Sequence, residues 1–246
     1  MMTRKLFTSA FAIGAMMLAT PALADPITLD SGDIGNSFTI DFDGFVEATQ
    51  DPVANLTSTL TLTLDSVSSN QYSFSYSLGN TTDGGLSSRV SSFAFNTDPD
   101  ISSASATGDY SFVVIDGSYP NGIGAVDVCF KAKDSGNCSN GDGVSEGATG
   151  SGTLALNFAG PVSGITLDDF FVRYQGIDGN GFNDGSASGQ AVSSSTTTTT
   201  TTSTSGGTPV PAPGMLGLFA AALFAIGLAG GRRRRRSDPV SGPAFA

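Results

Sequence analysis

The chain has 246 residues, enough for one sizeable domain once its two ends are set aside. Between residues 25 and 231 it carries 21 acidic and four basic residues, a net charge of −17, and no nucleic-acid partner is expected because neutralising phosphates needs a basic patch. Histidine is absent, which excludes the Ser-His-Asp triad, the Cys-His dyad and histidine-rich zinc sites.

The first predicted element is an apolar stretch at the N-terminus. Two basic residues precede an uncharged run from Leu6 to Leu18, and the small residues Ala22 and Ala24 flank Leu23. A basic start, a short apolar core and an A-x-A site are typical of a secretory signal peptide. We expect residues 1–24 to form a signal-peptide helix that is cleaved before Asp25, with an uncleaved membrane anchor as the alternative.

Residues 25–190 alternate between apolar and hydroxyl-bearing side chains. Such a period of two predicts half-buried strands, and no stretch of this region has a sustained helical period. About eight candidate strands follow at near-regular spacing: "NSFTIDFDGFVEA", "LTSTLTLTLDSV", "QYSFSYSLG", "RVSSFAFN", "GDYSFVVIDG", "GIGAVDVCF", "GTLALNFAG" and "LDDFFVRYQGI". The predicted fold is all-β, an antiparallel β-sandwich or jelly-roll-like domain whose serines and threonines face solvent.

The two cysteines of the chain lie in "VDVCFKAKDSGNCSN", with eight residues between Cys129 and Cys138. In an exported protein, an even pair that spans a loop rich in glycine, asparagine and serine predicts a disulfide. A metal-binding or catalytic thiol is the weaker alternative, because no histidine is present to assist it.

A glycine-rich loop near the end of the domain, "GIDGNGFNDG", offers oxygen ligands at alternating positions. Asp178, Asn180, Asn183 and Asp184 are the residue types that a hard cation prefers, so a calcium site is a candidate here. The spacing departs from the EF-hand pattern and no closing glutamate follows. A solvated turn is the competing interpretation.

Two further patterns bear on chemistry. Asp168 and Asp169 are adjacent, so on a regular strand they point to opposite faces and do not form a glycosidase pair; an enzyme is not expected.

Carbohydrate binding usually relies on exposed aromatic rings. The chain has no tryptophan, and its candidates for stacking are Tyr72, Tyr76, Tyr119 and Tyr174, of which the first two share the parity of the core residue Phe74.

The C-terminal part begins with a low-complexity segment. Residues 191–209, "AVSSSTTTTTTTSTSGGTP", cannot bury a core and predict a linker or stalk with possible O-glycosylation sites. An uncharged run of 17 residues from Met215 to Gly231 follows, about 25 Å as a helix and marginal for crossing a membrane. Arg232, Arg233, Arg234, Arg235 and Arg236 then predict a cytoplasmic C-terminus. The tail 237–246 ends the chain.

The order of these parts resembles the PEP-CTERM sorting signal of Gram-negative bacteria. The proline motif reads Val210, Pro211, Ala212, Pro213 and Gly214, with Ala212 where the class usually has glutamate. The resemblance covers residues 210–236 and implies export, temporary retention by the C-terminal helix and processing near the motif by an exosortase. Proteins of this class usually occur in organisms that make exopolysaccharide.

Residues 40–180 resemble the group named cistern family PEP-CTERM proteins. The resemblance rests on "GNTTDGGLSSRVSSFAFNTDPD", "VDVCFKAKDSGNCSNGDG", "GSGTLALNFAG" and "GITLDDFFVRYQGI". It implies a shared cysteine pair and a shared final aromatic strand, and it implies no activity.

From these patterns we expect an exported, non-enzymatic protein of the cell envelope or extracellular matrix, anchored at least transiently in the inner membrane. Its expected partners are an exosortase-type enzyme, the membrane and exopolysaccharide, and no cofactor is expected apart from the candidate calcium. The alternatives are a carbohydrate-binding or calcium-stabilised adhesion module and a simple periplasmic protein with a single-pass anchor.

Overall fold

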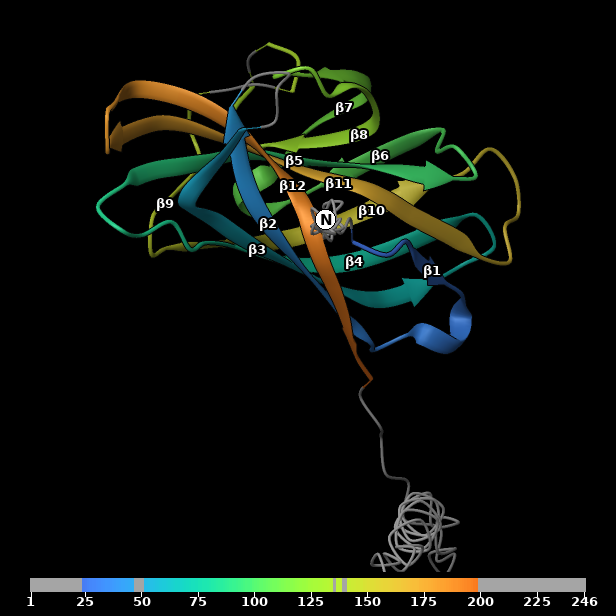
Figure 1. The fold of residues 1–246 in the computed structure, drawn as a ribbon. Coiled ribbons are helices and arrows are strands. Elements are labelled where there is room, and N and C mark those ends of the chain that lie inside the picture. Colours follow the sequence, from blue (N-terminus) through green and yellow to red (C-terminus); the bar gives the residue numbers. More distant parts are fainter. Residues whose placement is uncertain (1–23, 47–50, 135, 139–140, 199–246) are drawn as a thin grey trace, which may run out of the picture. The chain divides into compact units, whose positions relative to one another are not determined.

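The structure, a computed structural model, describes residues 24–46, 51–134, 136–138 and 141–198. Strands make up 68% of it and helical turns 4%. Twelve strands form one antiparallel sheet that is nearly closed into a barrel (Figure 1). The predicted all-β antiparallel class is confirmed, with the difference that one continuous sheet takes the place of the two separate sheets of a sandwich.

The elements follow one another in a simple order. They are β1 (Ile27–Leu29), η1 (Ser31–Asp33), β2 (Ser37–Val46), β3 (Asp51–Val67), β4 (Gln71–Asn80), β5 (Ser87–Asp98), β6 (Ser103–Ala106), η2 (Gly108–Tyr110), β7 (Phe112–Tyr119), β8 (Gly124–Lys131), β9 (Val144–Ser145), β10 (Thr149–Asn157), β11 (Ile165–Gly179) and β12 (Phe182–Thr197). Across the sheet the order is β6-β10-β4-β3-β2-β12-β11-β5-β8-β7, while β1 pairs with β11 and β9 with β5.

The alternating sequence explains how each strand divides its side chains between two faces. In β3, Leu60, Leu62 and Leu64 are fully buried, whereas the threonines between them are partly exposed. The register sets Leu62 beside Phe38 of β2 and Tyr76 of β4, so the apolar positions of neighbouring strands meet on the inner face. The period of two therefore builds the core directly.

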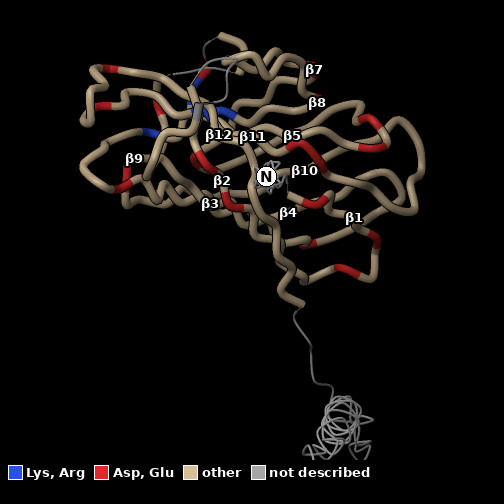
Figure 2. Tube along the Cα trace, viewed as in Figure 1, with Lys and Arg blue, Asp and Glu red and all other residues tan. Residues whose placement is uncertain are grey.

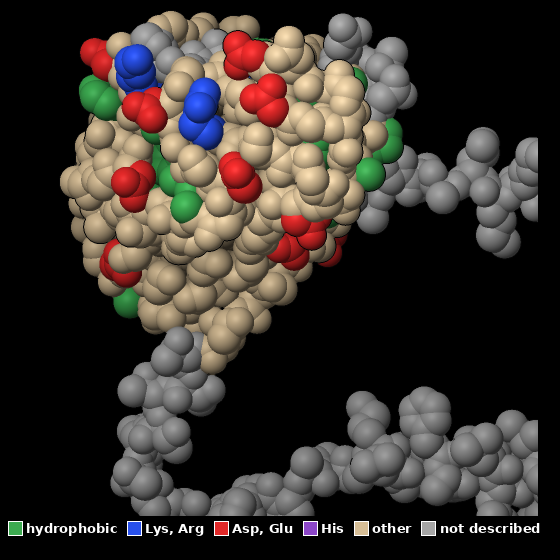
Figure 3. All heavy atoms as spheres, turned by 90° about the vertical axis from the view of Figure 1, so that its left-hand side faces the viewer, with side chains coloured by type: hydrophobic (Ala, Val, Ile, Leu, Met, Phe, Trp, Pro, Cys, Tyr) green, Lys and Arg blue, Asp and Glu red, His purple; other side chains and the backbone are tan. Residues whose placement is uncertain are grey.

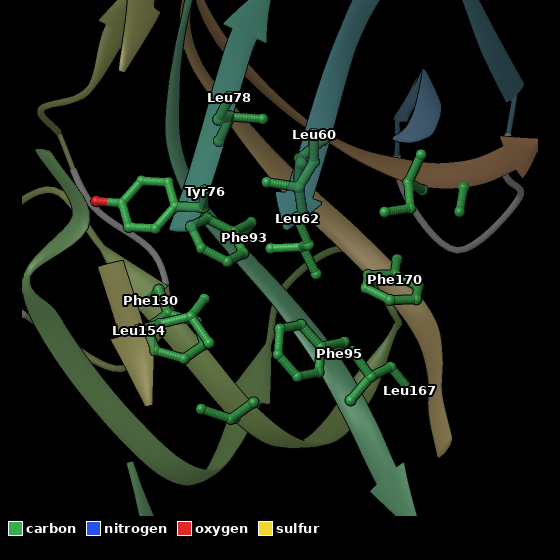
Figure 4. Packing of buried hydrophobic residues seen from close by; sticks show 14 of the residues in the cluster. Leu60, Leu62, Tyr76, Leu78, Phe93, Phe95, Phe130, Leu154, Leu167 and Phe170 are labelled. Atoms are coloured by element: carbon green, nitrogen blue, oxygen red, sulfur yellow. The ribbon is translucent and has the colours of Figure 1, made fainter. Parts of the chain in front are cut away.

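Aromatic side chains fill much of the interior. The rings of Phe93 and Phe130 are stacked with their centroids 5.0 Å apart, and Phe95 lies 5.9 Å from Phe130 and 5.3 Å from Phe170 (Figure 4). Each such pair stabilises the fold by about 0.5–1.5 kcal/mol beyond the free energy gained from burying the two rings. The interior is a packed core that also includes Leu154 of β10.

The last strand continues past the predicted end of the domain. We expected a linker from residue 191, but β12 continues to Thr197 and pairs with β2 from Ala191↔Phe42 to Thr197↔Ser37. A run of serine and threonine lacks apolar alternation, yet threonine is β-branched and suits a pleated strand. The side-chain pattern alone does not predict this pairing, because the strand is held by its backbone pairing with β2.

Both predicted terminal helices lie outside the described residues, the signal peptide in 1–23 and the apolar run in 199–246. Within the ranges that the structure does describe, no helix is long and apolar enough to cross a membrane.

Candidate functional site

The broadest surface feature is a hydroxyl-rich face on the outside of five neighbouring strands, β12, β2, β3, β4 and β10. We call it the hydroxyl face. The registers set its residues in rows across the sheet, of which the clearest are Thr197, Ser37, Thr63, Ser75 and Thr153, and Ser195, Thr39, Thr61, Ser77 and Ser151. Adjacent strands are about 4.8 Å apart and same-face residues about 6.8 Å apart along a strand, so the hydroxyls form a regular grid.

Many of these hydroxyls bond one another across strands. The Oγ of Ser37 lies 2.8 Å from Oγ1 of Thr63, and the two Oγ1 atoms of Thr39 and Thr61 are 3.2 Å apart. Thr59 donates to a carboxylate oxygen of Asp41 at 2.9 Å. Such cross-strand pairs stiffen the sheet and keep the hydroxyls aligned.

The face is hollowed at one place, over β4, β10 and β6. A cavity of about 320 Å³ is lined there by Asp65, Ser73, Ser105, Thr107 and Thr153, with Phe74, Ala106, Leu154 and Ala155 at its base. Ser75 donates to Asp65 at 2.7 Å, which fixes the carboxylate at the rim. The groove offers hydroxyl and carboxylate groups to a polar ligand.

The tyrosines do not form a stacking platform. All five are buried, including Tyr119 and Tyr174, which the sequence left available for sugar stacking. The hydroxyl of Tyr174 bonds Ser58 at 2.8 Å and that of Tyr119 bonds Ser92 at 3.1 Å, so both rings are held inside. Among the described residues, the exposed large hydrophobic side chains are Ile34, Phe112 and Val192.

A second cavity, of about 330 Å³, lies where β12 separates from β11. The β11–β12 pairing begins at Phe171↔Gln190, and β1 joins β11 only at Ile27↔Leu167, so residues 168–170 lack a partner on that edge. Asp168 and Asp169 both line the gap, together with residues 24–26.

This arrangement differs from the expected opposite-face placement of the two carboxylates. Asp169 has a φ of 49° and the register slips between Asp168 and Phe171, so a bulge turns both side chains to one cavity. Asp168 accepts from the amide of Asp169 at 2.7 Å, and Asp169 accepts from the side chain of Asn96 at 3.0 Å. Local hydrogen bonds thus hold both carboxylates at the bulge.

The predicted calcium loop forms the hairpin between β11 and β12. Asn180 and Gly181 have φ angles of 50° and 95°, which suit the two central residues of a tight hairpin turn. Asp178 accepts from the amide of Asp184 at 3.0 Å, and Asn180 donates to the carbonyl of Gly84 at 3.2 Å. These bonds give the side chains of Asp178 and Asn180 partners within the protein.

Asn183 is exposed beside them. Within the described ranges, no group of three or more His, Cys, Asp or Glu side chains is placed to hold a metal ion. The calcium site stays a prediction.

The two cysteines are free, buried thiols in this structure, so the predicted disulfide is not formed in it. The fold nevertheless places both in one small buried cluster. Burial, followed by a hydrogen bond with the Cys138 thiol, raises the pKa of Cys129. Ser92 donates to the carbonyl of Cys138 at 2.8 Å, and Gly117 leaves room for its sulfur, since an added Cβ would lie 2.6 Å away. The packing places the two thiols in one cluster, but forming the disulfide also requires an oxidant.

The domain's four basic residues lie in one part of the fold, whereas its acidic residues are spread over it (Figure 2). Lys131 is paired in register with Ser92, and Ser92 with Arg173. The Nζ of Lys131 donates to the carbonyl of Gly136 at 2.9 Å. Neither Arg89 nor Arg173 forms a side-chain hydrogen bond or an ion pair with another described residue.

Sequence reasoning missed these arginines because each is isolated along the chain, 84 positions apart and outside any motif. A faint signal was present: Arg173 interrupts the apolar strand "LDDFFVRYQGI" at a position where a charge is costly to bury.

The residues of the predicted sorting segment, Val210 to Gly214 and Arg232 to Arg236, lie outside the described residues, and so does Ala22. Ala24 is described: its amide donates to the carbonyl of Ala191 at 3.4 Å, next to the second cavity.

Comparison with known proteins gave no match to any family model, curated protein or solved structure.

Proposed function

We propose that the chain is an exported, non-enzymatic protein of the cell envelope or extracellular matrix, delivered by its C-terminal segment and associated with exopolysaccharide. The observation that carries this proposal is the co-occurrence, in one order, of a signal peptide, a β-domain, a hydroxyl-rich linker, a proline motif, an apolar run and five arginines. Each part is common alone, but together they are typical of the PEP-CTERM class.

In this proposal the tail acts as an address. An exosortase recognises Pro211, Pro213 and Gly214, flanked by Val210 and Ala212, while the five arginines keep the C-terminus in the cytoplasm until processing. The protein is then released to the cell surface or beyond. A plain inner-membrane anchor with a periplasmic domain is the competing proposal.

The surface of the domain supports a role among polar polymers. The rows of the hydroxyl face consist of serine and threonine side chains, the groove adds Asp65 and four apolar residues to them, and Figure 3 shows hydrophobic groups only sparsely on another side of the molecule. A surface of this kind can exchange hydrogen bonds with sugar hydroxyls through Ser73, Ser105 and Asp65.

The test is to map both termini of the protein by mass spectrometry, separately in membrane and extracellular fractions of the native host. We expect the mature form to start at Asp25 and to lack everything after the proline motif. Replacing Pro211 and Pro213 with alanine should leave the tail attached and the protein in the membrane fraction.

A matched control replaces Pro243, beyond the arginines, and should be processed like the wild type. Intact arginines on a membrane-bound wild-type protein would instead establish the plain anchor.

A further inference from the structure

Buried polar atoms without partners are concentrated at one place. In the described part of the chain, eight buried side-chain nitrogen or oxygen atoms lack a hydrogen bond, and five of them belong to Arg89, Arg173, Gln175 and Ser188. Most buried polar groups in proteins are satisfied, so such a cluster calls for an explanation such as an absent ligand. We call these four residues the arginine cluster.

The registers bring the arginine cluster together on the outer face of β11. Arg173 is paired with Ser188 of β12, and Gln175 is paired with Arg89 of β5. Arg173 and Gln175 are two residues apart on one strand, so they share a face. The guanidinium of Arg89 lies over Gly176, where an added Cβ would be 2.9 Å from Nη2.

Arg173 is the centre of the cluster, and no residue that the structure describes forms an ion pair with it. It is 7% exposed, and its Nε and Nη1 have no partner. Burial lowers the pKa of Arg173, but a guanidinium stays charged in proteins. An unpaired buried charge is strongly unfavourable, so the free fold is less stable than it would be with this group neutralised or removed.

The unpartnered atoms require both acceptors and donors from a ligand. The two arginines offer N–H donors, which suit a carboxylate, while the Oε1 of Gln175 accepts and the Oγ of Ser188 does both. A protein carboxylate offers acceptors only. A sugar acid offers a carboxylate and neighbouring hydroxyls together, which matches the cluster better.

We propose that the arginine cluster binds a uronate residue of an acidic polysaccharide, with its carboxylate on Arg173 and Arg89 and a ring hydroxyl on Gln175. The inference rests on the proposed function, because it names the kind of polysaccharide that an exported matrix protein would hold. The ligand enters from the side of Arg89 and Gln175, which are partly exposed, whereas Arg173 and Ser188 lie beneath. On a domain of net charge −17, these arginines give a polyanion a specific point of attachment.

The first experiment titrates the full-length protein, purified in mild detergent, with short oligomers of galacturonate, glucuronate and mannuronate, using a neutral malto-oligosaccharide as the control sugar. Calorimetry should show binding of at least one uronate oligomer and its weakening by added salt. Arg173→Gln should weaken that binding about tenfold to a hundredfold, the range expected for lost charge-assisted hydrogen bonds.

Two further variants separate the site from general charge. Arg173→Lys keeps the charge but loses the planar fork, and should bind clearly less well than the wild type. Lys133→Gln removes the same charge from an exposed residue of the loop after β8, and should bind nearly as well as the wild type.

Thermal unfolding gives a readout that a structural arginine would not produce. Without ligand, Arg173→Gln should melt at the same temperature as the wild type or higher, because it removes an unpaired buried charge. With the uronate oligomer present, only the wild type should gain stability. A variant that melts well below the wild type would show that Arg173 supports the fold, and would overturn the proposal.

Other outcomes also overturn it: no binding of any uronate oligomer, or equal binding of the neutral sugar. A calorimetric signal that comes only from self-association of the protein through its own acidic side chains would overturn it too. Correct processing at the proline motif without uronate binding would defeat this inference alone. Uronate binding by a protein whose tail is never cut would instead defeat the sorting proposal.

Discussion

Ser58 illustrates how this fold accommodates a polar side chain in its core. It is 1% exposed on β3, and its hydroxyl meets that of Tyr174 on β11 at 2.8 Å. The pair satisfies two groups that would otherwise be costly to bury, and it links strands that are not neighbours in the sheet. Arg173, one residue before Tyr174, shows the opposite case of a buried group without a partner.

A double-mutant cycle should measure the Ser58–Tyr174 pair. Ser58→Ala leaves the Tyr174 hydroxyl buried and unpaired, and should lower the free energy of unfolding by about 1–3 kcal/mol. Tyr174→Phe should have a similar effect, and the double variant should lose less than the sum. Denaturant unfolding gives the values, with Ser77→Ala on the hydroxyl face expected within about 0.5 kcal/mol of the wild type.

The cysteine pair allows a second prediction at this scale. Because the pKa of Cys129 is raised and both thiols are buried, neither should react with iodoacetamide in the folded reduced protein. In protein recovered from the exported fraction, mass spectrometry should find the two linked. Reduction should then lower the melting temperature, consistent with about 2–3 kcal/mol for a short closed loop. Free thiols in exported protein would contradict the disulfide.

Among the elements, the alternating strands were predictable and the irregular ones were not. The apolar parity of "LTLTLDSV" gave the inward face of β3 correctly, because a period of two has a single structural meaning in a half-buried strand. The bulge that turns Asp168 and Asp169 into one cavity breaks that period, and no local residue pattern marked it. The end of β12 was also missed, because its pairing depends on the backbone of β2 and not on its own side chains.

The same element yields a truncation test. A chain ending at Gln190 loses the pairs from Ala191↔Phe42 to Thr197↔Ser37, which leaves one edge of β2 without a partner. We expect this variant to melt at a lower temperature and to self-associate in size-exclusion chromatography, because an unpaired edge offers free amides and carbonyls. A chain ending at residue 198 should behave like the full domain. Equal behaviour of the two would mean that the last residues of β12 add nothing.

At the scale of the whole molecule, the main core and a smaller cluster around the cysteines together bury all five tyrosines. Of the two candidate sugar-binding tyrosines, Tyr174 belongs to the main core and Tyr119 to the smaller cluster that also contains both cysteines. Parity alone correctly assigned Tyr72 and Tyr76 to the core. It could not do so for Tyr119, whose burial depends on contacts with Phe171 and Cys138, which lie far away in the sequence. The arginine cluster was hidden for the same reason.

This shared burial predicts a steep loss of stability at alkaline pH. Burial raises the pKa of all five tyrosines above 10.0. The unfolded chain releases these protons at about pH 10 and the folded chain retains them, so stability is complete below that pH and falls above it. Each tyrosine contributes a slope of up to about 1.4 kcal/mol per pH unit.

Phenolate absorbance measures this effect directly, and it should appear only as the protein unfolds. Tyr72→Phe is a suitable comparison because the Tyr72 hydroxyl has no hydrogen-bond partner to lose. It should reduce the alkaline slope by one tyrosine. Gradual ionisation of the folded protein would instead show that some of the phenols are open to solvent.

The pairing of β12 with β2 also determines when during synthesis and export the sheet can be completed. The last strand of the domain closes against the second, so almost the whole domain must be available before the sheet can be completed. In the export proposed above the chain crosses the membrane N-terminus first, so β2 cannot pair with β12 until Thr197 has crossed as well. Such distant pairing is slow to form, so the waiting chain needs protection from aggregation. If the chain is exported and processed as proposed, a pause in translocation at the apolar run from Met215 to Gly231 comes after the final strand has crossed, so the domain has time to close before the C-terminal segment is removed.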